Sequence, residues 1–270
     1  MNTNQETLQA IAQELSHIRN EDIGLISGKM GAVIFFFHYA RYTGNKYYED
    51  IAMTFFDDVQ LQLQVRTVTS YRHGVAGIGI AIDYLIENEF IAADEDILDD
   101  FDQSLLAADL YNSETDLSLY DGLIGYGWYW LGRLNGKSKS DAISVFTEIM
   151  FFVRQKFRNL SIKERFDVHS FLFELGCTPE FGKNVYSMFD AFRRNTFHCI
   201  PESSYPRLIK SPAGEMARKY LLNRYWRFDG FHPSFPMMDE NLSGSKTLAW
   251  DGLYVLSVLS TKENAWIGLL

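Results

Sequence analysis

Pairs of glycines three positions apart recur along the chain, and their spacing constrains the fold more than any other feature. The pairs are Gly28 and Gly31, Gly74 and Gly77, and Gly122 and Gly125. They repeat with a period of about 47 residues, which is the length of a helix hairpin with its connections. Repeats of this size are typical of stacked or closed helical arrays. Weaker copies at 177–182 and 248–256 bring the number of predicted hairpins to five.

The segments that follow the glycine pairs are apolar on nearly every face, and those between them are amphipathic. The apolar helices are expected at 32–42, 78–85 and 126–134, and the others at 46–65, 94–111, 140–160, 161–175 and 213–225. A helix that is apolar all round belongs inside a protein, and an amphipathic helix covers its surface. We therefore predict an all-α fold, an α/α toroid with an inner barrel and an outer ring of helices. It should be a single domain over 1–270, with an irregular flap at 200–244.

The composition excludes several classes of protein. A net charge of -10 and a pI near 5.1 argue against a nucleic-acid partner, which needs a surplus of Lys and Arg. The positive charge gathers at 193–227, which we interpret as a solvated helix face or a basic rim. Two cysteines do not make a disulfide framework, and the apolar stretches are too short to span a membrane. We expect a cytoplasmic protein.

The loops before the inner helices should meet at one end of the barrel, because every inner helix begins there. The residues beside the glycines in these loops are Arg72 and His73, Tyr120 and Asp121, and Trp250 and Asp251. We predict that His73, Asp121 and Asp251 take part in proton transfer, with the other three binding the substrate. The alternative is that the two Asp residues cap helices and that His73 binds a neighbouring carbonyl.

The repeats resemble those of the lanthionine synthetase C-like family. The resemblance rests on Gly-Lys-Met-Gly at 28–31, Gly-Val-Ala-Gly-Ile-Gly at 74–79, Gly-Leu-Ile-Gly-Tyr-Gly at 122–127, and the apolar end Trp-Ile-Gly-Leu-Leu at 266–270. It implies an α/α toroid with a pocket at the end where the glycine loops gather. In the active bacterial enzymes, a zinc ion bound by two Cys and one His lowers the pKa of a peptide thiol. The thiolate then joins a dehydrated Ser or Thr, as in lantibiotic maturation.

The chain departs from this family at the zinc ligands. Cys177 precedes Gly182 by the spacing that the family uses for its first ligand, so we retain Cys177 as a substrate-binding residue. The family's Cys-His-Gly is replaced by Trp-Asp-Gly at 250–252, and His198 and Cys199 stand in reversed order. We therefore expect no zinc and no other cofactor. The resemblance leaves open whether the chain is an enzyme or a pseudoenzyme.

Three functions remain possible from the sequence. The first is binding or modification of a precursor peptide in a natural-product pathway, with that peptide and a peptide-modifying enzyme as partners. The second is a carbohydrate-active enzyme that uses the paired carboxylates of Asp121 and Asp251, because α/α barrels also serve sugar chemistry. The third is a non-catalytic scaffold for protein contacts.

Overall fold

The described part of the chain is built from helices. The computed structural model describes residues 3–18, 21–63, 68–93, 97–108, 110, 115–156, 158–182, 185, 188, 248–260, 266 and 269. The helices are α1 (Thr3–Ser16), α2 (Lys29–Thr43), α3 (Lys46–Leu63), α4 (Val75–Glu87), α5 (Asp99–Leu106), α6 (Leu123–Arg133), α7 (Lys139–Lys156), α8 (Ile162–Gly176) and α11 (Leu248–Leu259). These residues contain no β-strand, and the predicted all-α class is confirmed.

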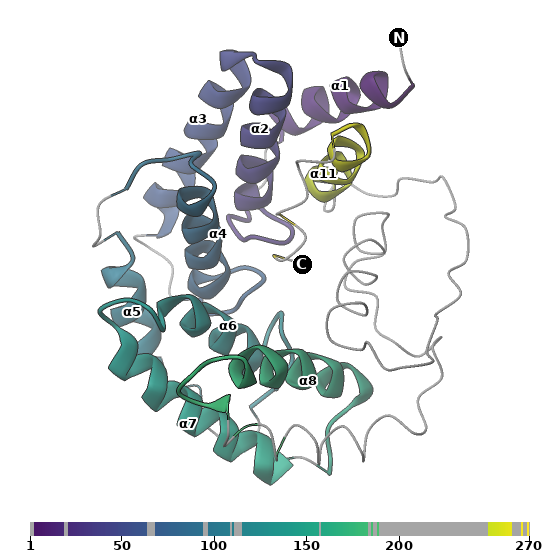
Figure 1. The fold of residues 1–270 in the computed structure, drawn as a ribbon. Coiled ribbons are helices and arrows are strands. Elements are labelled where there is room, and N and C mark those ends of the chain that lie inside the picture. The colour runs from purple at the N-terminus through teal and green to yellow at the C-terminus, as the bar shows by residue number, and fades with distance from the viewer. Residues whose placement is uncertain are drawn as a thin grey trace.

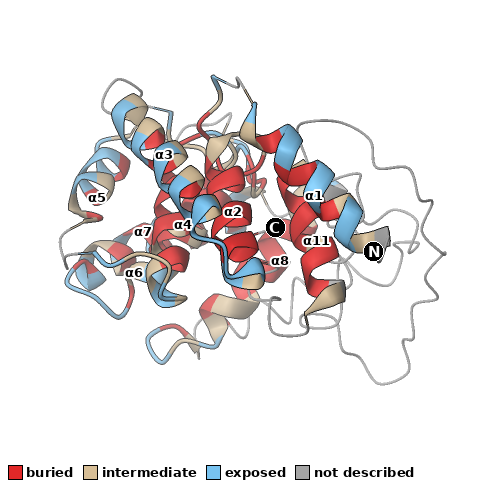
Figure 2. Ribbon diagram, turned by 90° about the horizontal axis from the view of Figure 1, so that it is seen from above, coloured by how far each residue is buried: buried red, intermediate tan, exposed pale blue. Residues whose placement is uncertain are grey.

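The helices form an α/α toroid, as predicted. Figure 1 shows α2, α4, α6, α8 and α11 round a central axis, with α3, α5 and α7 outside them. Every residue from Met30 to Ala40 of α2 is buried, whereas α3 buries only Ala52, Phe56 and Val59. Figure 2 shows the same difference as buried inner helices and exposed faces along α1 and α3. The distribution of apolar residues in the sequence therefore predicts correctly that α2 lies in the inner layer and α3 in the outer one.

The glycine pairs are required by space, because the preceding loop folds back on the first turn of each inner helix. A Cβ atom on Gly77 would lie 1.7 Å from the carbonyl oxygen of Tyr71, and one on Gly125 would lie 2.0 Å from that of Leu119. Real Cβ atoms do not approach other atoms so closely. The packing role that the sequence indicates for these glycines is therefore confirmed.

A third glycine, two positions after the pair in the second and third repeats but replaced by Val33 in the first, admits an aromatic ring from the next inner helix. A Cβ atom on Gly79 would lie 2.5 Å from the ring of Tyr129, and one on Gly252 would lie 2.4 Å from the ring of Phe35. Gly252 therefore corresponds to the third glycine of the motif and lies inside α11. The prediction that Trp250 and Asp251 stand in a loop before an inner helix is wrong.

The fourth inner helix, α8, was not recognised as one. It begins with the predicted capping box, in which Ser161 Oγ accepts from Glu164 N at 3.3 Å and Ser161 N donates to Glu164 Oε2 at 2.8 Å. Its carboxylates bind the loop before α6, since Leu117 N donates to Glu164 and Leu119 N donates to Asp167. These two acidic residues contact the loop of the neighbouring repeat, whereas each glycine pair contacts the loop before its own helix. The glycine motif is absent from the repeat that contains α8.

The two ends of the chain meet and join neighbouring parts of the ring. Helix α11 packs against both α1 and α2. Trp250 Nε1 donates a hydrogen bond of 2.9 Å to the carbonyl oxygen of Ile26, in the loop before α2. The last described inner helix is thereby fixed to the first one.

Several expectations lie outside the described residues. These are the flap at 200–244, the basic segment at 193–227 and the helix at 213–225. Helix α5 is shorter than the predicted 94–111, of which 94–96, 109 and 111 also fall outside. None of the helices in the described ranges combines the length and apolarity needed to cross a bilayer.

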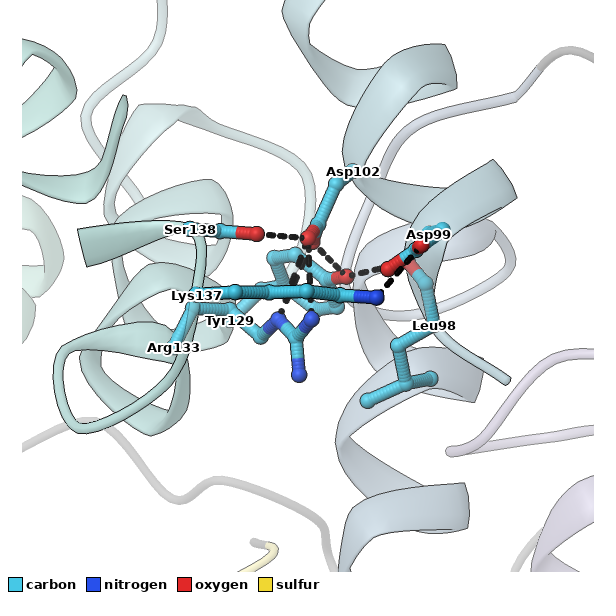
Figure 3. Close-up of polar contacts among 7 residues, drawn as sticks. All are labelled: Leu98, Asp99, Asp102, Tyr129, Arg133, Lys137 and Ser138. Carbon is cyan, nitrogen blue, oxygen red and sulfur yellow. Dashed lines mark hydrogen bonds and ion pairs between the residues drawn. The ribbon is translucent and has the colours of Figure 1, made fainter. Parts of the chain in front are cut away.

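A buried carboxylate ties α5 to α6 and α7 at the end of α6 far from its first turn. Asp102 accepts hydrogen bonds from Tyr129 Oη at 2.5 Å, from Arg133 Nη2 at 2.9 Å and from Ser138 Oγ. Figure 3 shows the three donors converging on this carboxylate. A buried charge is stable only when it is paired and hydrogen-bonded, and here both conditions hold.

We expect Asp102→Asn to lower the free energy of unfolding by about 2 kcal/mol, because the hydrogen bonds to the carboxylate lose their charge while the side chain keeps its shape. Urea denaturation followed by circular dichroism measures this loss. Asp99→Asn is the matched control, since Asp99 is half-exposed and pairs only with Lys137 in the described part of the chain. An equal loss in both variants would contradict this account.

Candidate functional site at the mouth of the toroid

Three loops precede α2, α4 and α6 and meet at one end of the ring, which we call the mouth. They span residues 21–28, 68–74 and 115–122. Neighbouring loops are hydrogen-bonded through their backbones: Ile26 N donates to Arg72 O at 3.2 Å, and Arg72 N donates to Tyr120 O at 2.9 Å. The backbone at the mouth is therefore held rigidly, which favours a fixed geometry of its side chains.

His73 and Asp22 form a polar pair at the mouth. Their Nδ1 and Oδ2 atoms are 2.7 Å apart, and the side chains are 44% and 24% exposed. Asp22 Oδ1 also accepts from Gly24 N at 2.9 Å, which fixes the carboxylate on its own loop. Because an ionised carboxylate can only accept, the imidazole donates through Nδ1 and leaves Nε2 as the basic nitrogen. Asp22 was not among the predicted residues.

Arg72 lies beside this pair and is held on two sides. Its Nε donates to Asp121 Oδ1 at 3.3 Å, and its guanidinium carbon lies 4.6 Å from the centre of the Tyr120 ring. The side chains of Arg72 and Asp121 are partly exposed, whereas Tyr120 is buried. Arg72, His73 and the carboxylates of Asp22 and Asp121 thus bring one cation, one imidazole and two anions together at the mouth.

Two tyrosines lie beneath these polar groups. The rings of Tyr71 and Tyr120 stack with their centres 6.3 Å apart, and both are buried. Burial raises the pKa of each phenol above its ordinary value, and the charges of Tyr71 and Asp167 add to this effect at Tyr120. Both hydroxyls stay neutral at physiological pH. They can therefore donate hydrogen bonds but cannot act as bases.

The structure brings four of the predicted residues together and separates the other three. The mouth lies at the N-terminal ends of α2, α4 and α6, three of the inner helices in Figure 1. Arg72, His73, Tyr120 and Asp121 lie in the loops of the mouth. Trp250 and Asp251 are 0% and 1% exposed within α11, so neither lies on an open surface. Cys177 caps the other end of α8, about 22 Å along the helix from its first turn.

The placement of Cys177 at the mouth was wrong for an identifiable reason. Its spacing to Gly182 imitates a loop that enters an inner helix, but the inner helix of that repeat is α8, which precedes it. The missed residue, Asp22, did carry a signal. Asp22 and Asp116 stand at the same distance before Gly28 and Gly122, and Asp116 stabilises its own loop by accepting from Ser118 N at 2.7 Å.

A sequence model described as lanthionine synthetase C-like protein matches residues 19–165. This match covers more than half of the chain and includes all three loops of the mouth. The chain belongs to the lanthionine synthetase C-like family. No curated protein and no solved structure matches it. The family assignment therefore rests on the repeats from α2 to α7 and on the helical fold.

The described residues of this lanthionine synthetase C-like protein do not fit the zinc site of the family. A catalytic zinc ion needs three protein ligands that converge on one point. Within the described ranges, no three His, Cys, Asp or Glu side chains lie close enough to hold a metal ion. Asp22 and His73 are in contact, but Cys177 lies at the far end of α8. His198 and Cys199 are outside the described residues. The expectation that no cofactor is bound stays a prediction.

Proposed function

We propose that this lanthionine synthetase C-like protein binds a precursor peptide at its mouth and that His73 transfers protons to and from it. The observation that carries the proposal is the 2.7 Å contact between His73 and Asp22 on an exposed rim. A carboxylate that accepts from Nδ1–H orients the imidazole and fixes its tautomer. The free Nε2 atom can then accept a proton from a nucleophile and return it later.

The neighbouring charges support a peptide as the ligand. Arg72 and Asp121 are both partly exposed, so they can exchange their mutual contact for carboxylate and ammonium groups of a peptide. The resemblance to the family implies addition of a cysteine thiol to a dehydrated residue. In that reaction, His73 would remove the thiol proton and supply one to the α-carbon after the sulfur–carbon bond has formed. We propose that this acid–base function is retained without zinc-dependent cyclisation.

Binding can be tested with a fluorescein-labelled synthetic peptide that has the sequence of a precursor encoded beside this gene. We expect His73→Ala to weaken binding at least tenfold, about 1.4 kcal/mol, measured by fluorescence anisotropy. His17→Ala is the matched control, because His17 is an exposed histidine just after α1 whose ring contacts Gln13 and Ser16 of that helix. Both variants should melt within 1–2 °C of the unchanged protein, since neither histidine is buried. Equal affinities of the two variants for the peptide would overturn the proposal.

The two other functions have less support. A glycosidase needs two carboxyl groups that flank the substrate, but Asp251 is buried in α11 and Asp121 is paired with Arg72. A scaffold for protein contacts does not need the polar cluster of Asp22, Arg72, His73 and Asp121. Peptide binding is the proposed function that uses this cluster.

A further inference from the structure

A cavity of about 320 Å³, which we call the distal cavity, lies at the end of α2 opposite the mouth. It is lined by the last turns of α2, the first turn of α3 and the loop after α4. In Figure 1 this is the region where α2 turns into α3. About 18 Å along α2 separate it from the first turn of that helix, at the mouth. A cavity of this size can hold a small molecule, and the groups at the mouth do not contribute to it.

The floor of the distal cavity is apolar and closely packed. Phe37 and Ala40 line it from α2, and both are buried. Phe90 lines it from the loop after α4, with its ring centre 5.5 Å from that of Phe37 and 4.8 Å from that of His38. These contacts fix the Phe90 ring before a ligand arrives. The floor therefore favours a ligand with an apolar group.

Arg41 is oriented at the cavity by two contacts. Its guanidinium carbon lies 3.6 Å from the centre of the Phe90 ring, and its Nη2 donates to the carbonyl oxygen of Asn88 at 2.6 Å. The side chain is exposed and has no carboxylate partner in the described part of the chain. A guanidinium has five N–H donors, so several remain for a ligand. Because the fork is already oriented, pairing with a carboxylate costs little side-chain entropy.

Lys46 supplies a second cation to the cavity as the first residue of α3. Asn45 caps this helix: its side chain accepts from Tyr47 N at 3.1 Å and its main-chain carbonyl accepts from Tyr48 N at 3.2 Å. Since these amides are already bonded, an anion in the cavity must be bound by side chains. Lys46 is exposed and forms no ion pair within the described ranges, so it can bind an anion together with Arg41.

Two carboxylates, those of Glu49 and Glu89, also line the cavity, and both residues are exposed. Neither side chain accepts a hydrogen bond from a described residue. The backbone torsion φ of Glu89 is 58°, and among the described residues only Gly44 shares a positive value. Glycine or asparagine adopts this conformation with less strain than glutamate. Strained residues of this kind cluster at functional sites, which indicates a role for the Glu89 carboxylate.

We propose that the distal cavity binds a free α-amino acid with an apolar side chain. Arg41 and Lys46 pair with its α-carboxylate. Glu49 and Glu89 pair with its ammonium group, and the apolar side chain covers the floor. A carboxylate without an ammonium group would leave two anions of the cavity unpaired, and an amine without a carboxylate would leave two cations unpaired. The cavity therefore selects a ligand that carries both charges.

Isothermal titration calorimetry with L-leucine and L-phenylalanine tests the proposal. We expect saturable binding of both, with dissociation constants below about 1 mM. Two analogues of L-leucine separate the charges, since 4-methylpentanoate lacks the ammonium group and 3-methylbutylamine lacks the carboxylate. Each should bind about tenfold more weakly or less, because one pair of charged hydrogen bonds is lost. No saturable binding of either amino acid, or equal affinity for L-leucine and 4-methylpentanoate, would overturn the proposal.

Two variants test the residues that carry it. Arg41→Gln should weaken L-leucine binding about tenfold or more, whereas Arg154→Gln, which changes an exposed arginine of α7, is the matched control and should leave it unchanged. Glu89→Gly should also weaken binding, yet raise the melting temperature by about 1–4 °C because glycine relieves the strain at φ 58°. Unchanged affinity in Arg41→Gln or in Glu89→Gly would contradict the proposed site.

This proposal does not rest on the proposed function, and the two can fail separately. His73→Ala should leave the affinity for L-leucine unchanged, because His73 lies at the mouth and does not line the distal cavity. Loss of L-leucine binding in a folded His73→Ala protein would mean that the amino acid binds at the mouth, which would overturn the distal site.

Discussion

Gly77→Ala is expected to lower the free energy of unfolding by about 4 kcal/mol or more, the largest effect that we predict for the described part of the chain. The added Cβ atom would lie 1.7 Å from Tyr71 O and 2.7 Å from the Tyr71 carbonyl carbon. Neither atom can retreat easily, because Arg72, the next residue, is hydrogen-bonded on both sides, to Ile26 and to Tyr120. The strain therefore passes into all three loops of the mouth.

Differential scanning calorimetry of the purified variant measures this loss. Gly136→Ala is the matched control, since the nearest atom to its added Cβ is Arg133 O at 3.7 Å, an ordinary contact. We expect the control to stay within about 0.5 kcal/mol of the unchanged protein. If Gly77→Ala melted at the same temperature as the control, the loop 68–74 would not pack against the first turn of α4.

Trp250→Ala is expected to destabilise the chain by about 4 kcal/mol, the second largest effect. Removal of a fully buried tryptophan typically costs about 3–5 kcal/mol through lost burial and the cavity left behind. The substitution also removes the hydrogen bond to Ile26 O and the ring against which Trp266 packs. The sequence suggested a binding residue whose loss would spare stability, but its burial predicts the opposite.

Guanidinium denaturation followed by circular dichroism tests the role of Trp250. Trp128→Ala is the matched control, because Trp128 lies on the inner helix α6 but is only half-buried, so its loss should cost less than half as much. Trp250→Phe should fall between the two, since it keeps a ring and loses the N–H donor. If Trp250→Ala has the same free energy of unfolding as the unchanged chain, Trp250 does not stabilise the contact between α11 and the loop before α2.

The sequence predicted those features that depend on backbone spacing. A carbonyl can rest on a helix only where Cβ atoms are missing, so the glycine pairs revealed three loops and the helices that follow them. The fourth repeat has no glycine pair and contacts the neighbouring loop through Glu164 and Asp167, which accept from its amides, so a search for glycines could not find it. Gly252 was recognised as part of a repeat but was aligned with the wrong glycine of the motif. A single glycine does not show whether it contacts a loop, as the paired glycines do, or an aromatic ring, as Gly252 does.

The candidate site was only partly predictable. Residues adjacent to the glycines, such as His73, could be located from the repeat alone. Asp22 reaches His73 from another loop, and the pairing of two loops is a property of the closed ring that no local pattern encodes. Cys177 shows the converse, since a correct spacing between two residues carries no information about which end of a helix they occupy.

The meeting of α1 and α11 has a consequence for synthesis of the chain. The partner of Ile26 O is a side chain at position 250, and the partner of the Tyr71 hydroxyl is a carbonyl at position 269. A ribosome releases the first two hairpins long before it adds either partner. The earliest part of the nascent polypeptide must therefore wait with open hydrogen-bonding groups until residues 250 and 269 have been added, which makes it the natural place for a chaperone to bind.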